Sequence, residues 1–163
     1  MSFDVFLQRF KGGEPAEADR VSVLEVLRAE KHTEFDQFGF LIVTFHDGID
    51  VEFSASGLES NDSFTGCAFH VRGFGEALVK FMFDVARAGD MVILPAMEGA
   101  PVGLANDAQR CEIPPEMQRD FGLARLQSAH DLGLLLKGGF EAWSNYREAI
   151  QRKADPESSA PRL

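Results

Sequence analysis

Residues 38–53, FGFLIVTFHDGIDVEF, decide the fold because they hold two strand-like runs separated by a turn signal. The first run, 38–46, is the most apolar stretch of the chain, and the second, 49–56, alternates polar and apolar residues. Asp47-Gly48 between them is a strong short-range hairpin signal. The stretch therefore predicts an antiparallel hairpin at the centre of a sheet.

A two-residue loop at Asp47-Gly48 would also fix how the two strands pair. The expected cross-strand pairs are His46 with Ile49, Thr44 with Val51, and Ile42 with Phe53. In this register Leu41, Val43 and Phe45 lie on the face opposite the core. A strand that is apolar on both faces is usually covered on both sides. We therefore expect the second face of the sheet to be covered by the C-terminal third of the chain or by a partner.

Outside the hairpin, the sequence alternates between strand-like and helix-like patterns. Strands are expected at 3–10, 64–72 and 91–95, and helices at 21–30, 75–90, 113–121 and 140–151. Asp19 is the expected N-cap of the first helix, and the second has the clearest helical spacing of apolar residues. The order predicts an α+β fold. Its mainly antiparallel sheet has about five strands with two amphipathic helices on one face, ferredoxin-like in character, followed by a C-terminal helical extension.

The length and composition indicate one globular unit. A chain of 163 residues with 45% hydrophobic residues can bury a core without disulfides. We expect a single domain over residues 1–152 and a disordered tail over 153–163, where Pro, Ser and charged residues predominate. Residues 98–139 form a long irregular segment, and such segments are often functional or mobile.

The charge and cysteine content exclude several classes of protein. The chain has 26 acidic and 16 basic residues, a net charge of −10, and no cluster of Lys and Arg to bind a nucleic acid. It has no apolar run long enough to span a membrane. Its two cysteines form no disulfide framework, and the opening residues 1–10 lack the features of a signal peptide. These features indicate a cytoplasmic protein with free thiols.

The sequence contains no pattern that predicts a catalytic, metal or cofactor site. Cys67 and His70 are three residues apart, so on a strand they point to opposite faces and cannot share an ion. Gly73-x-Gly75 precedes a helix, but Leu78 occupies the third position of a dinucleotide-binding turn. No nucleophile elbow is present. We therefore expect no metal and no cofactor, and an enzyme is the less favoured class.

Acidic residues bracket the hairpin and the loop after it, and they are the candidate binding residues. These residues are Asp47, Asp50, Glu52, Glu59 and Asp62. Together they could form a surface complementary to a basic protein partner, or they could simply be a solvated edge. Two alternatives stay open: a homodimer through the second sheet face, and a small-molecule-binding protein or minor enzyme with a pocket between the sheet and residues 98–139.

Two segments resemble a set of small bacterial proteins of unknown function. Residues 1–16, MSFDVFLQRFKGGEPA, are similar to their Met-Ser-Phe-Asp strand and Gly-Glu-Pro turn. Residues 84–99, DVARAGDMVILPAMEG, resemble their apolar helix that leads to a short strand ending at Pro. Some small acidic α+β proteins of this kind look like immunity partners of bacterial toxins. The resemblance implies a protein-binding role and identifies no functional residue.

Overall fold

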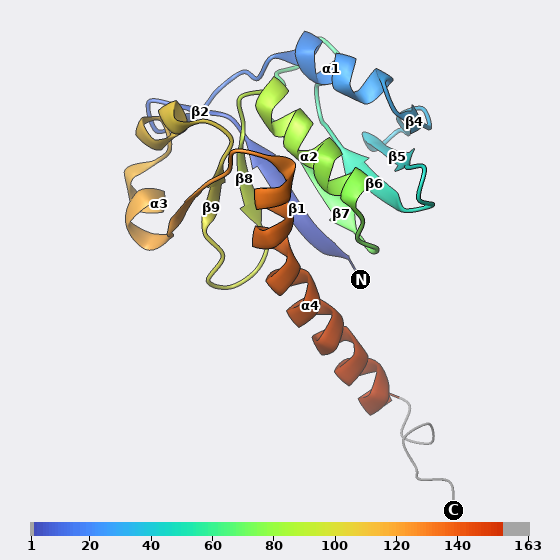
Figure 1. Ribbon diagram of the computed structural model, residues 1–163. Helices are drawn as coiled ribbons and strands as arrows, with labels where there is room; N and C mark the ends of the chain where they lie inside the picture. Colours follow the sequence, from blue (N-terminus) through green and yellow to red (C-terminus); the bar gives the residue numbers. More distant parts are fainter. Residues whose placement is uncertain (1, 155–163) are drawn as a thin grey trace, which may run out of the picture.

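The computed structural model describes residues 2–154, except for the side chains at positions 142, 143, 146 and 154 (Figure 1). Its main sheet has eight strands in the order β10-β9-β8-β1-β7-β6-β5-β4. The bounds are β1 (Phe3–Gln8), β4 (Lys31–His32), β5 (Phe40–Thr44), β6 (Asp50–Ser54), β7 (Gly66–Val71), β8 (Val92–Pro95), β9 (Val102–Leu104) and β10 (Leu123–Arg125). A separate two-stranded ribbon consists of β2 (Phe10–Lys11) and β3 (Glu14–Pro15).

Five helical segments complete the α+β fold. They are α1 (Arg20–Arg28), α2 (Glu76–Ala88), the 3-10 helix η1 (Asp107–Cys111), α3 (Pro115–Asp120) and α4 (Ala129–Ala154). The expected sheet of about five strands is wrong, because β4, β9 and β10 extend it at both edges. The sheet is also partly parallel, since β10 pairs with β9 in parallel while the other neighbours pair antiparallel.

The central hairpin forms, but its predicted register is wrong by one residue. Val43 pairs with Val51 and Leu41 with Phe53. The loop has three residues, 46–48, because the Phe45 N–H donates to the Ile49 carbonyl at 2.9 Å. Gly48 takes a positive φ of 84°, the conformation that closes a three-residue hairpin loop with a bulge.

A shift of one residue moves every side chain of a strand to the other face. Leu41, Val43 and Phe45 therefore lie in the core with Val51 and Phe53, and all five are buried. Ile42, which was assigned to the core, points outward and is 44% exposed. The expectation that both faces of the sheet need cover is wrong for this hairpin, because Leu41, Val43 and Phe45 lie on the core face and not on the second face.

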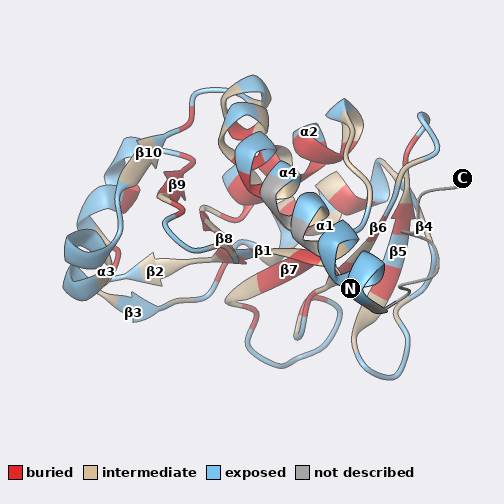
Figure 2. Ribbon diagram, turned by 90° about the horizontal axis from the view of Figure 1, so that it is seen from below, coloured by how far each residue is buried: buried red, intermediate tan, exposed pale blue. Residues whose placement is uncertain are grey.

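Helices α1, α2 and α4 lie together on one side of the sheet (Figures 1 and 2). The expectation that the C-terminal helix covers the second face is wrong, since α4 packs against α2. The ring of Phe140 lies edge-on to Phe3 and stacked on Phe74, with centroids 6.3 and 5.1 Å apart. The second half of α4 extends away from the sheet (Figure 1).

Phenylalanine rings form the centre of the main core. Phe81 of α2 contacts the rings of Phe45, Phe53 and Phe69, with centroids 5.6, 6.1 and 5.8 Å apart. Edge-on and tilted ring pairs of this kind add to the energy of burial. This cluster fixes α2 over the middle of the sheet.

The segment expected to be irregular, 98–139, covers the far end of the sheet. It contains β9, η1, α3, β10 and the start of α4. Val92, Val102, Leu104 and Ile113 form a second, smaller buried cluster beneath it. Of the expected tail, residues 153 and 154 belong to α4, and residues 155–163 lie outside the described part of the chain.

Asp19 caps α1, as predicted, and this cap gives a pH-dependent stability. Its carboxylate accepts from the hydroxyl and the backbone N–H of Ser22 at 2.7 and 3.1 Å. These two bonds, the hydroxyl first, lower the pKa of Asp19 below its ordinary value of 3.8. Because the pKa of Asp19 is lower in the folded state than in the unfolded state, the ionised carboxylate stabilises the fold at pH values above the unfolded-state pKa. This stabilisation is lost as the pH falls through the folded-state pKa.

We therefore expect Asp19→Ala to lower the Tm at neutral pH and to lose this effect as the pH falls below the ordinary Asp pKa. Circular dichroism melts at several pH values measure it. Glu25→Ala, an exposed change within the same helix, is the control and should alter the Tm little at any pH. An Asp19→Ala deficit that is the same at acidic and neutral pH would contradict the capping role.

Candidate functional site

The side of the sheet that faces away from α1, α2 and α4 is the candidate functional site, and we call it the open face. It spans β1, β5, β6, β7 and β8 (Figure 2). Strand side chains alternate between faces, so the residues here are the ones between the core positions. Phe6 and Ile42 are 43% and 44% exposed on it. A sheet side with large exposed apolar residues is the feature of this fold that most needs an explanation.

Cross-strand pairing arranges the open face into two rows. The polar row runs across four strands as Ile42, Glu52, His70 and Asp4. The apolar row beside it runs across five strands as Phe40, Ser54, Ala68, Phe6 and Leu94. Because neighbours in a row lie directly opposite each other, each row is a continuous strip of contacting side chains.

His70 is held in one orientation at the centre of the polar row. Its Nδ1 lies 2.9 Å from Oδ1 of Asp4, and its Nε2 lies 3.5 Å from Oγ of Ser54. The ring of Phe40 packs beside the imidazole with centroids 5.6 Å apart. Because an ionised carboxylate only accepts, the Nδ1 N–H of His70 donates to Asp4. Ser2 also donates to Asp4 Oδ1, at 2.8 Å.

The order Asp4–His70–Ser54 is that of a serine hydrolase triad, but the surroundings do not suit acyl transfer. That chemistry needs hydrogen-bond donors aimed at a developing oxyanion. In a sheet the backbone N–H groups lie in the plane of the strands and pair with neighbouring strands, so they do not point at the face. The arrangement instead provides an oriented imidazole that can hydrogen-bond to a bound molecule.

Shallow hollows mark the open face. One of about 500 Å³ lies over the apolar row between Phe6, Phe10 and Ser54. A second of about 200 Å³ adjoins residues 98–139 and is also lined by Phe6. Phe6 and Leu94 line both, so the two hollows are neighbours. A third, of about 400 Å³, lies at His70 and Arg72.

The structure separates the five acidic residues predicted to bind a partner. Asp50 and Glu52 lie on the open face, and Glu52 is opposite His70. Asp47 lies in the hairpin loop, where its Oδ1 accepts from the Ile49 N–H at 3.1 Å. Glu59 and Asp62 lie in the loop that follows β6.

The length of β6 separates the acidic residues at the hairpin end, Asp47 and Asp50, from Glu59 and Asp62 in the loop after the strand. At about 3.3 Å per residue, its five residues place the two ends about 13 Å apart. Arg20 of α1 donates to the backbone carbonyls of Ser60 and Asp62, so this loop lies beside α1. Asp50 and Glu52 are thus the two predicted residues that belong to the open face.

Asp4, Phe6 and His70 are site residues that the sequence analysis did not select. The alternation of β1, FDVFLQ, puts Asp4 and Phe6 on one side, and this signal was available. His70 was considered only as a partner of Cys67. The structure confirms that these two residues face opposite sides, because Cys67 is buried opposite Leu7 whereas His70 pairs with Asp4.

Neither cysteine belongs to the two rows of the open face, although Cys67 is among the residues that line the hollow over the apolar row. Burial raises the pKa of the Cys67 thiol, which makes it a poor nucleophile. Cys111 is exposed at the end of η1. Within the described residues, no group of three or more His, Cys, Asp or Glu side chains is placed to hold a metal ion.

Comparisons with known proteins do not assign a family to this chain. No protein-family model matches it, and searches of curated proteins and of solved structures find no match. Among the helices of residues 2–154, none combines the length and the apolar character that crossing a membrane requires. The proposal below therefore depends on the geometry and chemistry of the site.

Proposed function

We propose that this protein is a non-catalytic protein-binding module that uses the open face to bind a partner with a basic and apolar surface. The observation that carries the proposal is that two large apolar side chains stay exposed on the open face, Phe6 of the apolar row at 43% and Ile42 of the polar row at 44%. Large apolar side chains exposed on a sheet face among polar groups are a feature of interaction surfaces. The flat shape of the face suits a protein more than a small ligand.

Charge supports a basic partner. Asp4, Asp50 and Glu52 place three carboxylates on or beside the polar row. The whole chain carries a net charge of −10, so its field attracts a basic surface and accelerates encounter with it. A second copy would bring carboxylates against carboxylates across a two-fold axis, which disfavours a homodimer through this face.

The finer proposal is that the partner is a bacterial toxin or another protein that this chain regulates. It follows from the similarity of residues 1–16 and 84–99 to small bacterial proteins, some of which look like immunity partners. An immunity-type role needs a surface that can form a stable complex, and the exposed apolar and acidic side chains of the open face support this proposal. Suppression of a partner's toxicity on coexpression is the direct functional test.

The alternative proposal, a small-molecule-binding protein or minor enzyme, places the ligand between the sheet and residues 98–139. The hollow there has about 200 Å³ and is lined by apolar residues such as Phe6, Met117 and Phe121. Ligand pockets usually have about 300–1,000 Å³ and a few converging polar groups. The size and chemistry of this hollow favour the protein-binding proposal.

The test is affinity capture with the full chain, followed by titration of the purified partner by calorimetry. Phe6→Asp and Ile42→Asp should each weaken binding by at least about tenfold, because each puts a charge into the apolar contact. Val21→Asp is the matched control: Val21 is 67% exposed on α1, so it should bind like the wild type. Affinity should also fall as salt increases.

Two results would overturn the proposal. One is a purified partner that binds Phe6→Asp, Ile42→Asp and the wild type equally well, because the interface would then lie elsewhere. The other is repeated capture that yields no protein able to rebind in purified form. Circular dichroism of each variant shows whether a loss of binding reflects a loss of fold.

A further inference from the structure

A groove between α2 and the first turns of α4 lies away from the open face, on the helical side of the molecule (Figure 1). Its volume is about 880 Å³, within the range of about 300–1,000 Å³ that is usual for small-molecule sites. It is the largest of the hollows described for residues 2–154. Nothing in the proposed protein-binding function uses it.

One stripe from each helix lines the groove. On α2 the lining residues follow helical spacing from Glu76 to Arg87, and on α4 from Ala129 to Lys137. The two helices run antiparallel, because Phe74 before α2 stacks on Phe140 and Val79 lies next to Gly133. Arg87 therefore lies at the end of the groove where α4 begins.

The floor of the groove is apolar. Phe83 and Val79 of α2 form part of it and are buried by the surrounding side chains. Leu134 of α4 lies on the wall and is 63% exposed, although the neighbouring Leu132 and Leu136 are fully buried in the core. An exposed leucine beside an apolar floor indicates a surface that gains from being covered by aliphatic carbon.

The rim of the groove carries three cationic side chains, Lys80, Arg87 and Lys137, together with two carboxylates, Glu76 and Asp84. Lys80 is paired with Asp84 at 2.6 Å, and that carboxylate raises the pKa of Lys80. In the described residues Arg87 has no carboxylate within ion-pair distance, and its guanidinium lies over the Phe83 ring, 5.5 Å from the centroid. His130 lines the same end of the groove, and Lys137 lines it further along α4.

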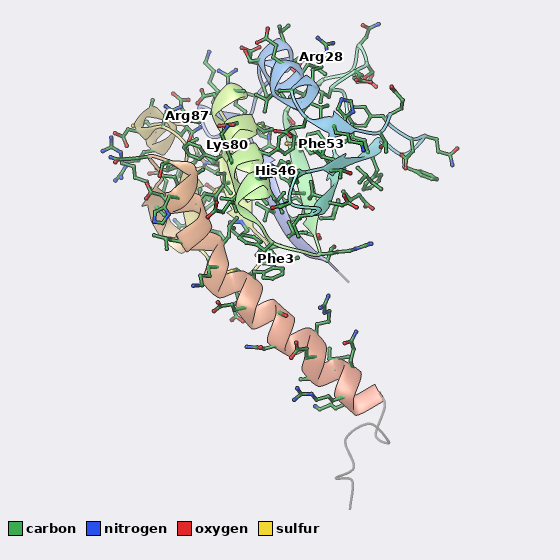
Figure 3. All side chains as sticks on the ribbon, turned by 45° about the vertical axis from the view of Figure 1, so that its right-hand side comes forward. Phe3, Arg28, His46, Phe53, Lys80 and Arg87 are labelled. Carbon is green, nitrogen blue, oxygen red and sulfur yellow. The ribbon has the colours of Figure 1, made fainter. Side chains whose placement is uncertain are left out.

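We propose that this groove binds a free amphiphile with a single anionic head and an aliphatic tail, such as a long-chain carboxylate. The tail lies along Leu134, whose exposed side chain it removes from water, and over the apolar floor that includes Val79 and Phe83. The head lies at Arg87, whose planar guanidinium matches a carboxylate with two parallel hydrogen bonds. Figure 3 shows Arg87 and Lys80 on the outer surface of α2, where they can be reached.

Three probes separate the contributions of head and tail. Dodecanoate below its critical micelle concentration should bind, as measured by calorimetry and by a rise in Tm. Butanoate keeps the head without the tail, and dodecyltrimethylammonium keeps the tail with the opposite charge. Both should bind at least about tenfold more weakly than dodecanoate. Equal binding of the anionic and cationic amphiphiles would overturn the proposal, and so would absence of dodecanoate binding.

Variants locate the site. Arg87→Glu and Leu134→Asp should each weaken dodecanoate binding by at least about tenfold. Arg28→Glu reverses a charge in the last turn of α1, outside the groove (Figure 3), and should bind like the wild type. Leu134 is so exposed that its substitution leaves the core intact, so this variant tests the site even if Arg87→Glu perturbs the fold. If Arg28→Glu weakened dodecanoate binding as much as Arg87→Glu does, the attraction would be nonspecific and the proposed site would be wrong.

A vesicle sedimentation experiment distinguishes binding of a free amphiphile from binding to a membrane surface. Vesicles of phosphatidylcholine containing phosphatidylglycerol offer the same head charge on a bilayer. A concave groove between two helices should take single molecules, so the chain should remain in the supernatant when these vesicles are sedimented. Cosedimentation that Arg87→Glu abolishes would show that the surface recognises a bilayer, and would overturn the proposal of a free ligand.

Discussion

Phe81→Ala is expected to lower the free energy of unfolding by about 3–5 kcal/mol, the usual cost of replacing a buried Phe by Ala. Phe81 is 2% exposed and its ring touches Phe45, Phe53 and Phe69. The substitution removes the ring from the centre of the core and leaves a cavity among three rigid neighbours. Because Phe81 joins α2 to the sheet, the cavity cannot close without moving the helix.

Urea denaturation at constant pH measures the change, and an unchanged m-value shows that the same surface unfolds. Phe38→Ala is the matched control, because it is the same chemical change at a residue that is 73% exposed. Substitutions at such positions usually alter stability by less than about 0.5 kcal/mol. A Phe81→Ala loss no greater than that of Phe38→Ala would mean that the aromatic cluster does not hold α2 on the sheet.

The hairpin shows how far local sequence predicts this fold. The pattern of residues 38–53 predicted two antiparallel strands, and the structure confirms them as β5 and β6. It did not predict the register, because a loop of two or three residues is compatible with Asp47-Gly48 and the choice depends on which faces can be buried together. The three-residue loop puts five buried apolar residues of the hairpin on one side and leaves Phe40 and Ile42 on the other.

Very short strands and a glycine-containing helix were the other elements that the sequence did not predict. Strands β4, β9 and β10 have two or three residues, too few to show an alternating pattern, and they form because neighbouring strands pair with them. The first half of α4 contains Gly133 and Gly139, which lower helix propensity. In the folded chain an added Cβ at Gly139 would collide with the Met97 side chain, which would have to shift, whereas at Gly133 it would make an ordinary contact with Val79.

The open face follows from the same change of register. With the predicted pairing, Leu41, Val43 and Phe45 would have occupied this face, and a cover would have been required. With the observed pairing, the face carries Glu52 opposite His70, and only scattered apolar side chains remain on it. Asp50 and Glu52 could be named from sequence as acidic strand residues. The contact of His70 with Asp4 joins strands that are 66 residues apart, and no local pattern predicts it.

The second large effect is expected in the loop that follows β6, where Gly57→Ala should cost about 2 kcal/mol or more. Gly57 has φ of 85°, a conformation that costs an L-residue about 1–2 kcal/mol. An added Cβ would in addition collide with the backbone carbonyl of Ser63. The carbonyl cannot move freely, because Ser63 Oγ and the Phe64 N–H both donate to Glu17 Oε2 at 3.1 Å.

Gly39→Ala is the matched control, since Gly39 has nearly the same φ, 81°, and no atom within 4 Å of an added Cβ. It should show the conformational cost alone, so the difference between the two variants measures the collision. Urea denaturation of both variants gives this difference directly. If both variants lost the same free energy of unfolding, the loop after β6 would relax easily around the added Cβ. The Glu17 contacts would then not hold Phe64, which is fully buried beneath this loop. A larger loss in Gly57→Ala shows that the loop is a fixed part of the fold.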